Sequence, residues 1–262
     1  MSIVYGPVPS WRLGRSLGVD LLCSKDKRCS FDCTYCQLGR TGIHTTERGN
    51  FVDLDQMEAE IKALGASVRY DVVTFSGTGE PTLARNLPDA HRAVKRMLKA
   101  PTALLTNSSL MADVEVREGL VDFDIVVAKL DADSEGHFKH INRPAKGIDF
   151  EAMVVGLKRF RETYSGTLAL DVMLIGQNMR YTEKIARLAL EIMPDEVHLN
   201  TPLRPCAAKP LGMEVMRKLS LSFKGLNVRM VYDCVGKAPK VEPIDAFQTR
   251  MRRPVVAARR GI

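Results

Sequence analysis

The sequence predicts an α/β protein built as a partial (β/α)6-type TIM barrel, a parallel sheet with helices outside it. Short apolar, β-branched runs alternate with amphipathic helical stretches at intervals of roughly 20–40 residues, which predicts right-handed βαβ units. Several runs are apolar at successive positions, as in 125–128, and such runs suit parallel strands covered on both faces. Six or seven units are too few for a closed barrel of ~250 or more residues, so the barrel is expected to be open.

The individual elements follow from these runs and from the residues that flank them. The expected strands are 17–22, 71–75, 103–106, 124–130, 168–175, 196–199 and 228–232. A helix is expected after Asp53, a good N-cap residue, with Gly65 as its left-handed stop. Further helices are expected after Asp149 and Thr182, and Pro194 ends the last of them.

Small and polar residues follow nearly every expected strand. The carboxyl ends of parallel strands meet at one rim, where the chemistry of such folds is found. The residues at this rim are the cysteine group 29–36, then 76–81, 107–109, Asp131, 176–178 and 200–202. Their convergence predicts a single functional site there.

The chain is expected to form one domain over 1–262, with an N-terminal extension at 1–15 and a basic C-terminal tail at 245–262. Its composition, 45% hydrophobic and 26% charged, is that of a globular protein. No apolar run reaches the ~18–20 residues of a membrane span, and the start lacks the pattern of a secretory signal. We therefore expect a cytoplasmic protein without membrane partners.

The net charge of +7 owes much to the arginines after Asp245. A basic tail can meet nucleic acid, an anionic substrate or a protein partner. A solvated, frayed terminus explains the same pattern equally well.

Three cysteines form a CxxxCxxC motif at Cys29, Cys33 and Cys36. Three thiolates on one short loop can meet three corners of a cubane cluster and leave the fourth iron open to a small molecule. A structural zinc ion is bound by four ligands, commonly in two pairs. His44, the nearest histidine in the sequence, is poorly placed to be the fourth ligand beside the three cysteines. A plain ferredoxin would supply a fourth cysteine. The motif therefore favours a [4Fe–4S] cluster with a vacant iron, with zinc as the alternative.

CxxxCxxC with an aromatic residue before its last cysteine, here Tyr35, resembles the signature of radical S-adenosylmethionine (SAM) enzymes. Residues 76–81 resemble the GGE motif of that superfamily, although Thr78 interrupts the glycines. Further stretches are similar to the Fe–S oxidoreductases grouped with archaeal tRNA wyosine synthases. These are 5–10 through 18–20, 76–83, 141–144 and 199–205.

The resemblance implies an oxidoreductase that works anaerobically. Its reduced cluster would cleave SAM, and the 5′-deoxyadenosyl radical would take a hydrogen atom from a small metabolite or an RNA nucleobase. A reductant such as ferredoxin or flavodoxin would supply the electron. The first alternative is an activating enzyme for a glycyl-radical partner protein, and the second is a non-enzymatic Fe–S or zinc protein.

The resemblance also implies SAM contacts at the rim. Gly77 and Gly79 would let the backbone approach the methionyl amine, and Glu80 would accept a hydrogen bond from it. Lys129 and Asp131 share one side of a strand and would meet SAM, or would form a structural ion pair. The remaining expected contacts, each with packing or helix capping as its alternative, are Tyr35, Asn107, Ser108 and Asn178.

Substrate contacts are expected from residues beyond these. They are Asn142, Arg143, Asn200, Arg204 and Cys234. The first two lie in a connection of more than thirty residues, 132–166, which is expected to act as a lid or to be a surface turn. Cys23, Cys206 and Cys234 would hold an auxiliary cluster or remain free thiols.

Overall fold

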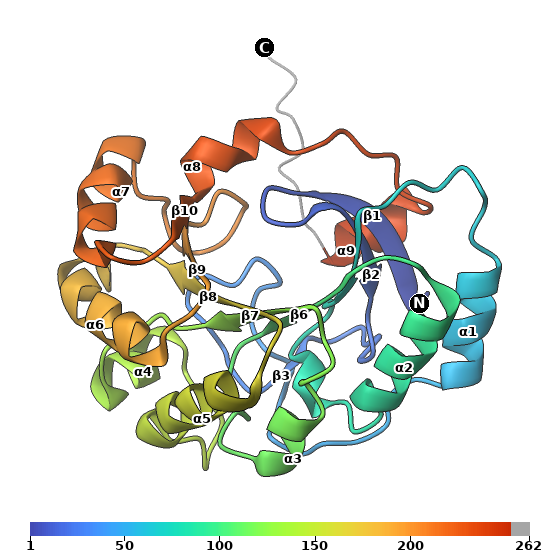
Figure 1. Cartoon of the computed structure of the whole chain (residues 1–262), viewed down its shortest axis with the longest axis horizontal. Helices are drawn as coiled ribbons and strands as arrows, with labels where there is room; N and C mark the ends of the chain where they lie inside the picture. Colours follow the sequence, from blue (N-terminus) through green and yellow to red (C-terminus); the bar gives the residue numbers. More distant parts are fainter. Residues whose placement is uncertain (253–262) are drawn as a thin grey trace.

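The main sheet of the protein has eight strands and curls into a half-barrel with helices on its outer face (Figure 1). The structure is a computed structural model and describes residues 1–252. The strands, in their order across the sheet, are β1 (Val4–Ser10), β2 (Gly14–Val19), β5 (Val72–Phe75), β6 (Thr102–Thr106), β7 (Ile125–Lys129), β8 (Thr167–Met173), β9 (Glu196–Asn200) and β10 (Val228–Met230). All neighbours pair in parallel except β1, which is antiparallel to β2. The predicted partial barrel is confirmed.

All seven predicted strands are present, from β2 to β10 in the main sheet. The first lies three residues earlier than expected, because the carboxylate of Asp20 accepts hydrogen bonds from the backbone N–H groups of Leu22 and Cys23 and turns the chain there. A second, two-stranded sheet joins β3 (Arg28–Cys29) to β4 (Ile43–His44).

The segment expected as an N-terminal extension instead contributes β1 to the main sheet. Its Pro7 and Pro9 conceal the strand in the sequence, since proline lacks the N–H that a sheet ladder needs. As an edge strand β1 pairs only with β2, and an edge position tolerates proline.

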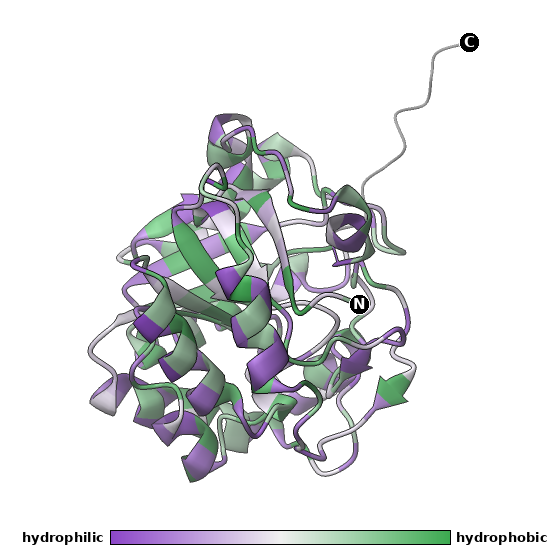
Figure 2. Cartoon of the chain, turned by 90° about the vertical axis from the view of Figure 1, so that its right-hand side faces the viewer, coloured by the Kyte–Doolittle hydropathy of each residue, from purple (hydrophilic) through white to green (hydrophobic). Residues whose placement is uncertain are grey.

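The helices are α1 (Leu54–Lys62), α2 (Leu87–Met97), α3 (Val114–Glu118), α4 (Glu135–Ile141), α5 (Phe150–Thr163), α6 (Thr182–Ile192), α7 (Met213–Ser220), α8 (Val231–Cys234) and α9 (Ala246–Arg252). Short 3₁₀ turns lie at Pro81–Leu83, Met179–Tyr181, Leu221–Phe223 and Val235–Lys237. In Figure 2 the helices carry hydrophilic and hydrophobic residues in alternating bands, as helices with one covered face do. No helix among residues 1–252 is long and apolar enough to cross a membrane.

The predicted N-cap at Asp53 is confirmed, and Asp149 caps its helix in the same way. The side chains of Asp53 and Asp149 accept hydrogen bonds from the first turns of α1 and α5. The predicted stop at Gly65 is wrong, because α1 already ends at Lys62 and Gly65 is not in the left-handed region. Helix α6 ends just before Pro194, where Met193 takes a left-handed conformation.

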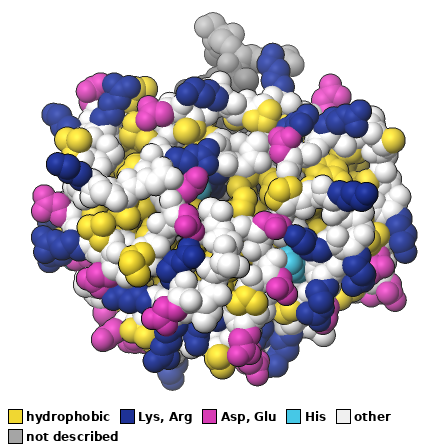
Figure 3. Space-filling model, in the orientation of Figure 1, with side chains coloured by type: hydrophobic (Ala, Val, Ile, Leu, Met, Phe, Trp, Pro, Cys, Tyr) yellow, Lys and Arg dark blue, Asp and Glu magenta, His cyan; other side chains and the backbone are white. Residues whose placement is uncertain are grey.

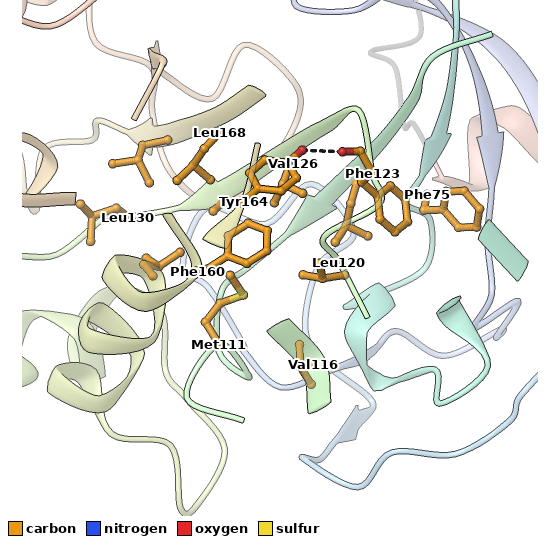
Figure 4. Packing of buried hydrophobic residues seen from close by; sticks show 14 of the residues in the cluster. Phe75, Met111, Val116, Leu120, Phe123, Val126, Leu130, Phe160, Tyr164 and Leu168 are labelled. Carbon is orange, nitrogen blue, oxygen red and sulfur yellow. Dashed lines mark hydrogen bonds between the residues drawn. The ribbon is translucent and has the colours of Figure 1, made fainter. Parts of the chain in front are cut away.

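The connection 132–166 is not a loop, because it contains α4 and α5. Helix α5 packs against the sheet through Phe160, and Tyr164 follows it into the same core (Figure 4). The Tyr164 hydroxyl donates a 2.8 Å hydrogen bond to the carbonyl of Phe123. The lid expected over 132–166 is therefore wrong, since buried aromatic packing holds this segment in place.

The C-terminal segment expected as a basic tail begins with α9, which lies beside β1 (Figure 1). The backbone N–H of Ile244 donates to the carbonyl of Gly6, and the side chain of Arg252 is fully buried. The rest of that tail, 253–262, lies outside the described residues. A frayed terminus is thus excluded for residues 246–252.

Candidate functional site

A cavity of about 1220 Å³ lies at the carboxyl ends of the parallel strands. Its wall takes residues from the cysteine loop, from the ends of β5, β6, β7, β8 and β9, and from the β1–β2 turn. The chain after α8 closes another side through residues 238–242. The predicted rim therefore borders a large cavity that is open to solvent on one side.

The cysteine loop runs from β3 along one wall of this cavity. The backbone N–H of Asp32 donates to the carbonyl of Asn142 (3.0 Å), and that of Thr34 donates to the carbonyl of Ile141 (2.9 Å). These bonds fasten the loop to the end of α4. Within the loop, Cys29 and Cys36 line the cavity.

Cys29 is buried and Cys33 and Cys36 are half-buried, and all three lie near the buried side chain of Lys27. Burial raises the pKa of Cys29 to about 12 and that of Cys33 to about 11, so neither thiol is ionised near neutral pH by itself. Burial alone would lower the pKa of Lys27, but its position against Cys36, Cys29 and Cys33 raises it. The Lys27 ammonium therefore favours the thiolate forms of Cys29 and Cys33, and metal-bound cysteines are thiolates.

All six cysteines are free. Within residues 1–252, no group of three or more His, Cys, Asp or Glu side chains converges on one metal ion. In a cubane cluster each cysteine binds a separate iron, so its ligands need not converge on one point. The three thiols, the buried lysine and the adjoining cavity fit such a cluster.

The loop Gly77–Glu80 is joined directly to the cysteine segment. The backbone N–H of Arg28 donates to the carbonyl of Thr78, and the N–H of Glu80 donates to the carbonyl of Arg28, both at 3.1 Å. A Cβ on Gly79 would lie 1.5 Å from the Arg28 oxygen, and one on Gly77 would lie 2.1 Å from the carboxyl carbon of Asp20. Both positions thus require glycine, because a side chain there would clash with neighbouring residues of the protein. Both glycines also line the cavity.

The carboxylate of Glu80 is buried at the cavity wall. It accepts hydrogen bonds from the Thr82 N–H and hydroxyl, from the Thr106 hydroxyl, and from the Asn107 N–H at 2.6 Å. Burial raises the pKa of Glu80, although these donors oppose the change. The same donors hold the carboxylate in one orientation.

A chain of buried ion pairs crosses the cavity floor. Lys129 Nζ lies 3.1 Å from Asp131 Oδ1 and 2.9 Å from Asp171 Oδ2, and Arg12 Nη1 lies 2.6 Å from Asp171 Oδ1. The Tyr35 hydroxyl donates to Asp131. Burial alone would raise the pKa of Asp171, but Lys129 and Arg12 hold it well below its usual value. Lys129 and Asp131 thus form the ion pair that the sequence offered as one alternative. Lys129 and Asp171 also line the cavity.

Eight of the residues predicted for SAM or substrate come together on the cavity wall. They are Tyr35, Gly77, Gly79, Glu80, Asn107, Lys129, Asn200 and Arg204. Arg204 Nη1 donates to the side-chain oxygen of Gln37 at 3.0 Å.

The other predicted contacts do not line the cavity. Asn178 donates to the carbonyls of Asp131 and Met173, and Ser108 donates to the carbonyl of Lys129, so both fasten strand ends. The residues outside the described lining are Cys33, Ser108, Asp131, Asn142, Arg143, Asn178 and Cys234.

Two predicted substrate residues surround the cysteine loop instead. Asn142 was expected to face the substrate. It is instead buried, and its amide donates a 2.9 Å hydrogen bond to Asp131. Arg143 is exposed at the end of α4, 3.8 Å from Asp32. Both depart from the prediction because α4 turns them toward the loop and away from the cavity.

The remaining cysteines occupy separate surroundings. Cys23 Sγ donates to the carbonyl of Met1 (3.2 Å), and Cys206 Sγ donates to that of Ala208 (3.3 Å). Cys234 ends α8.

Sequence reasoning missed Arg12, Asp171 and Arg252 on the cavity wall. Arg12 lies in the segment that was expected to be an extension, and Arg252 lies in the one expected to be a tail. Asp171 is the charged residue in a largely apolar strand. A charge at such a position commonly has a buried partner or a function, and this pattern could have identified Asp171 from the sequence.

Charges of both signs are interspersed on the face shown in Figure 3. The excess positive charge of the chain does not gather there into one basic patch.

Comparisons with known proteins give a family match and similar proteins. The family model described as the radical SAM superfamily matches residues 26–189. A UPF0026 protein of Methanocaldococcus jannaschii is 37% identical to this chain. The matched segment covers 90% of this chain and 76% of the length of that protein.

Two solved structures share the fold. A radical SAM methyltransferase from Sphaerobacter thermophilus has a TM-score of 0.60 at 15% identity, covering 82% of this chain and 65% of its own. Streptococcus suis SuiB bound to S-adenosylmethionine has a TM-score of 0.59 at 16% identity. The match covers 80% of this chain and 50% of the SuiB chain. This chain therefore spans two thirds or less of the length of either.

Proposed function

This chain belongs to the radical SAM superfamily, and on that premise we propose that it binds a [4Fe–4S] cluster through Cys29, Cys33 and Cys36 and uses SAM to abstract a hydrogen atom from its substrate. The observation that carries the proposal is the cysteine loop, with Lys27 buried against its three thiols and a large cavity in front of it. When bound and reduced, the cluster would supply the electron that cleaves SAM to methionine and a 5′-deoxyadenosyl radical.

The residues of this chain would hold SAM between the cysteine loop and the cavity floor. The backbone of Gly77 and Gly79 lines the cavity, and the fixed carboxylate of Glu80 would accept a hydrogen bond from the methionyl amine. Lys129 would meet the carboxylate of SAM while it remains paired with Asp171. Asn107 and Tyr35 complete this part of the wall.

The part of the cavity lined by the chain after β9 would take the substrate. Asn200 and Arg204 line it beside Leu203, and the chain at 238–242 would help to exclude water. Pockets for small ligands commonly measure about 300–1,000 Å³. A cavity of about 1220 Å³ has room for SAM and a small second molecule, so we propose a small metabolite or a single nucleobase as substrate.

Anaerobic reconstitution tests this function. The loaded protein, mixed with dithionite and SAM, should release 5′-deoxyadenosine. Cys33→Ala should lose both the cluster absorbance and the product, whereas Cys234→Ala should keep both, because Cys234 lies outside the loop. An intact cluster that releases no 5′-deoxyadenosine would contradict the proposed chemistry.

The kind of substrate has its own test. Filter binding of bulk tRNA should show weak affinity if the substrate is a free metabolite. Tight binding that declines steeply with added salt would instead assign the site to a nucleobase within RNA. The physiological electron donor is proposed to be a ferredoxin or flavodoxin, which should replace dithionite in the same assay.

A further inference from the structure

Two asparagine amides, one at the end of α4 and one after β6, reach sulfur atoms of the cysteine loop. Asn142 Nδ2 lies 3.5 Å from Cys33 Sγ, and Asn107 Nδ2 lies 3.5 Å from Cys29 Sγ. We propose that Asn142 and Asn107 are positioning residues that raise the reduction potential of the cluster through N–H···S hydrogen bonds. The inference rests on the proposed function, since it requires a cluster on these cysteines.

The neighbours of Asn142 determine which end of its amide faces the sulfur. Nδ2 lies 2.9 Å from Asp131 Oδ2. That carboxyl group is also paired with Lys129 and accepts from the Tyr35 hydroxyl, so the NH2 group points toward it as a further donor. The second N–H then has two acceptors within reach, Cys33 Sγ at 3.5 Å and the Tyr35 hydroxyl oxygen at 3.3 Å. Tyr35 already donates its own proton to Asp131.

Asn107 is oriented by a different contact. Its Oδ1 accepts a 2.9 Å hydrogen bond from the backbone N–H of Ser109, so its Nδ2 faces the cysteine loop. There it lies 2.9 Å from Ser30 Oγ and 3.5 Å from Cys29 Sγ. Because Asn142 ends α4 and Asn107 follows β6, the two amides hold the loop from separate elements.

Reduction adds one negative charge to a cluster, and part of that charge resides on its cysteine sulfurs. Hydrogen bonds to those sulfurs stabilise the reduced form more than the oxidised form and so raise the potential. Cys29 is only 7% exposed and Asn142 only 2%, so each N–H···S pair has one member that is shielded from water.

The experiment compares reconstituted holoproteins in anaerobic redox titrations without SAM, followed by the electron paramagnetic resonance signal of the reduced cluster. Asn142→Leu and Asn107→Leu keep the side-chain size and remove the donor. Asn86→Leu is the matched control, because Asn86 is also buried but its amide donates to the carbonyl of Val52.

Each of the two test variants should show a reduced-to-oxidised ratio about tenfold lower at a given potential, a shift of about 59 mV toward more negative values for a one-electron couple. The control should titrate like the unaltered protein. Asn107 is only partly buried at the cavity wall, so Asn107→Leu carries the test even if Asn142→Leu assembles poorly.

Two outcomes would overturn the inference. One is an unchanged midpoint potential in variants that retain full iron and sulfide. The other is loss of iron from both folded variants, which would assign the asparagines to cluster retention. If the unaltered protein itself binds no cluster, the proposed function fails, and iron analysis of that sample distinguishes this case.

Discussion

Arg252 Nε donates a 2.8 Å hydrogen bond to Asp20 Oδ2, and both side chains are buried away from solvent. The same carboxylate accepts hydrogen bonds from the N–H and the hydroxyl of Thr78, in the loop Gly77–Glu80. The last described helix is therefore linked through one aspartate to the loop proposed to bind SAM.

Replacing this arginine should destabilise the whole protein. Arg252→Met leaves Asp20 buried without its cation, and losing one partner of a buried ion pair costs about 3–5 kcal/mol. Urea denaturation would measure the change in the free energy of unfolding. Arg250→Met, two residues away on the exposed side of α9, should change it by less than about 0.5 kcal/mol. Equal stabilities for the two variants would rule out a stabilising role for the pair.

Asp171 should make stability depend on pH in the acid range. A carboxyl whose pKa is lower in the folded than in the unfolded chain contributes stability that is complete above the unfolded pKa, near 4. That contribution disappears as the pH falls toward the lower folded pKa. The pKa of Asp171 is depressed in this way by Lys129 and Arg12, against the effect of burial.

We therefore expect Asp171→Asn to cost about 3 kcal/mol near pH 7, with the difference from the unaltered protein narrowing as the pH falls below about 4. Urea titrations at several pH values would measure it. Asp122→Asn, at an exposed position, serves as the control. A difference that stays constant across the acid range would contradict the assignment.

Gly79→Ala should disrupt the junction between the two loops of the site. The added Cβ would lie 1.5 Å from the carbonyl oxygen of Arg28, so the backbone must shift, at a cost of about 3 kcal/mol. Thermal unfolding and SAM binding to the loaded protein would both report the change. Gly136→Ala, whose Cβ meets nothing within 4 Å in α4, should be neutral or slightly stabilising. Similar behaviour of the two variants would show that the contact at Gly79 is tolerated.

The cysteines outside the loop should not affect iron content. A variant with Cys23→Ser, Cys206→Ser and Cys234→Ser should bind as much iron and sulfide per chain as the unaltered protein, because the first two thiols donate to separate backbone carbonyls. Colorimetric iron and sulfide analysis after anaerobic reconstitution measures this. A reproducible decrease would indicate an auxiliary cluster.

Much of the sheet could be predicted because its strands are apolar at successive positions and need only local sequence to identify them. Strand β1 could not, since Gly6, Pro7 and Pro9 resemble a loop and its edge position is known only from the fold. Segment 132–166 was also hard to predict from local sequence. A helix was expected after Asp149, but the packing of α4 and α5 that fixes the rest of the segment is known only from the fold.

The rim of the site was predictable from the rule that parallel strands end on one side. The partners of its residues were not. Arg12 and Asp171 are 159 positions apart, and nothing local to either indicates the other. Asn142 was expected to face substrate, because the sequence around it does not reveal that α4 turns its amide toward the cysteines.

The contact between Asp20 and Arg252 joins residues 232 positions apart. Strand β2 and the cysteine loop are synthesised long before the arginine that pairs with Asp20. A ribosome-bound chain that stops before residue 252 therefore leaves that carboxylate without its cation, and the hairpin of β1 and β2 reaches its final packing only after α9 has been added.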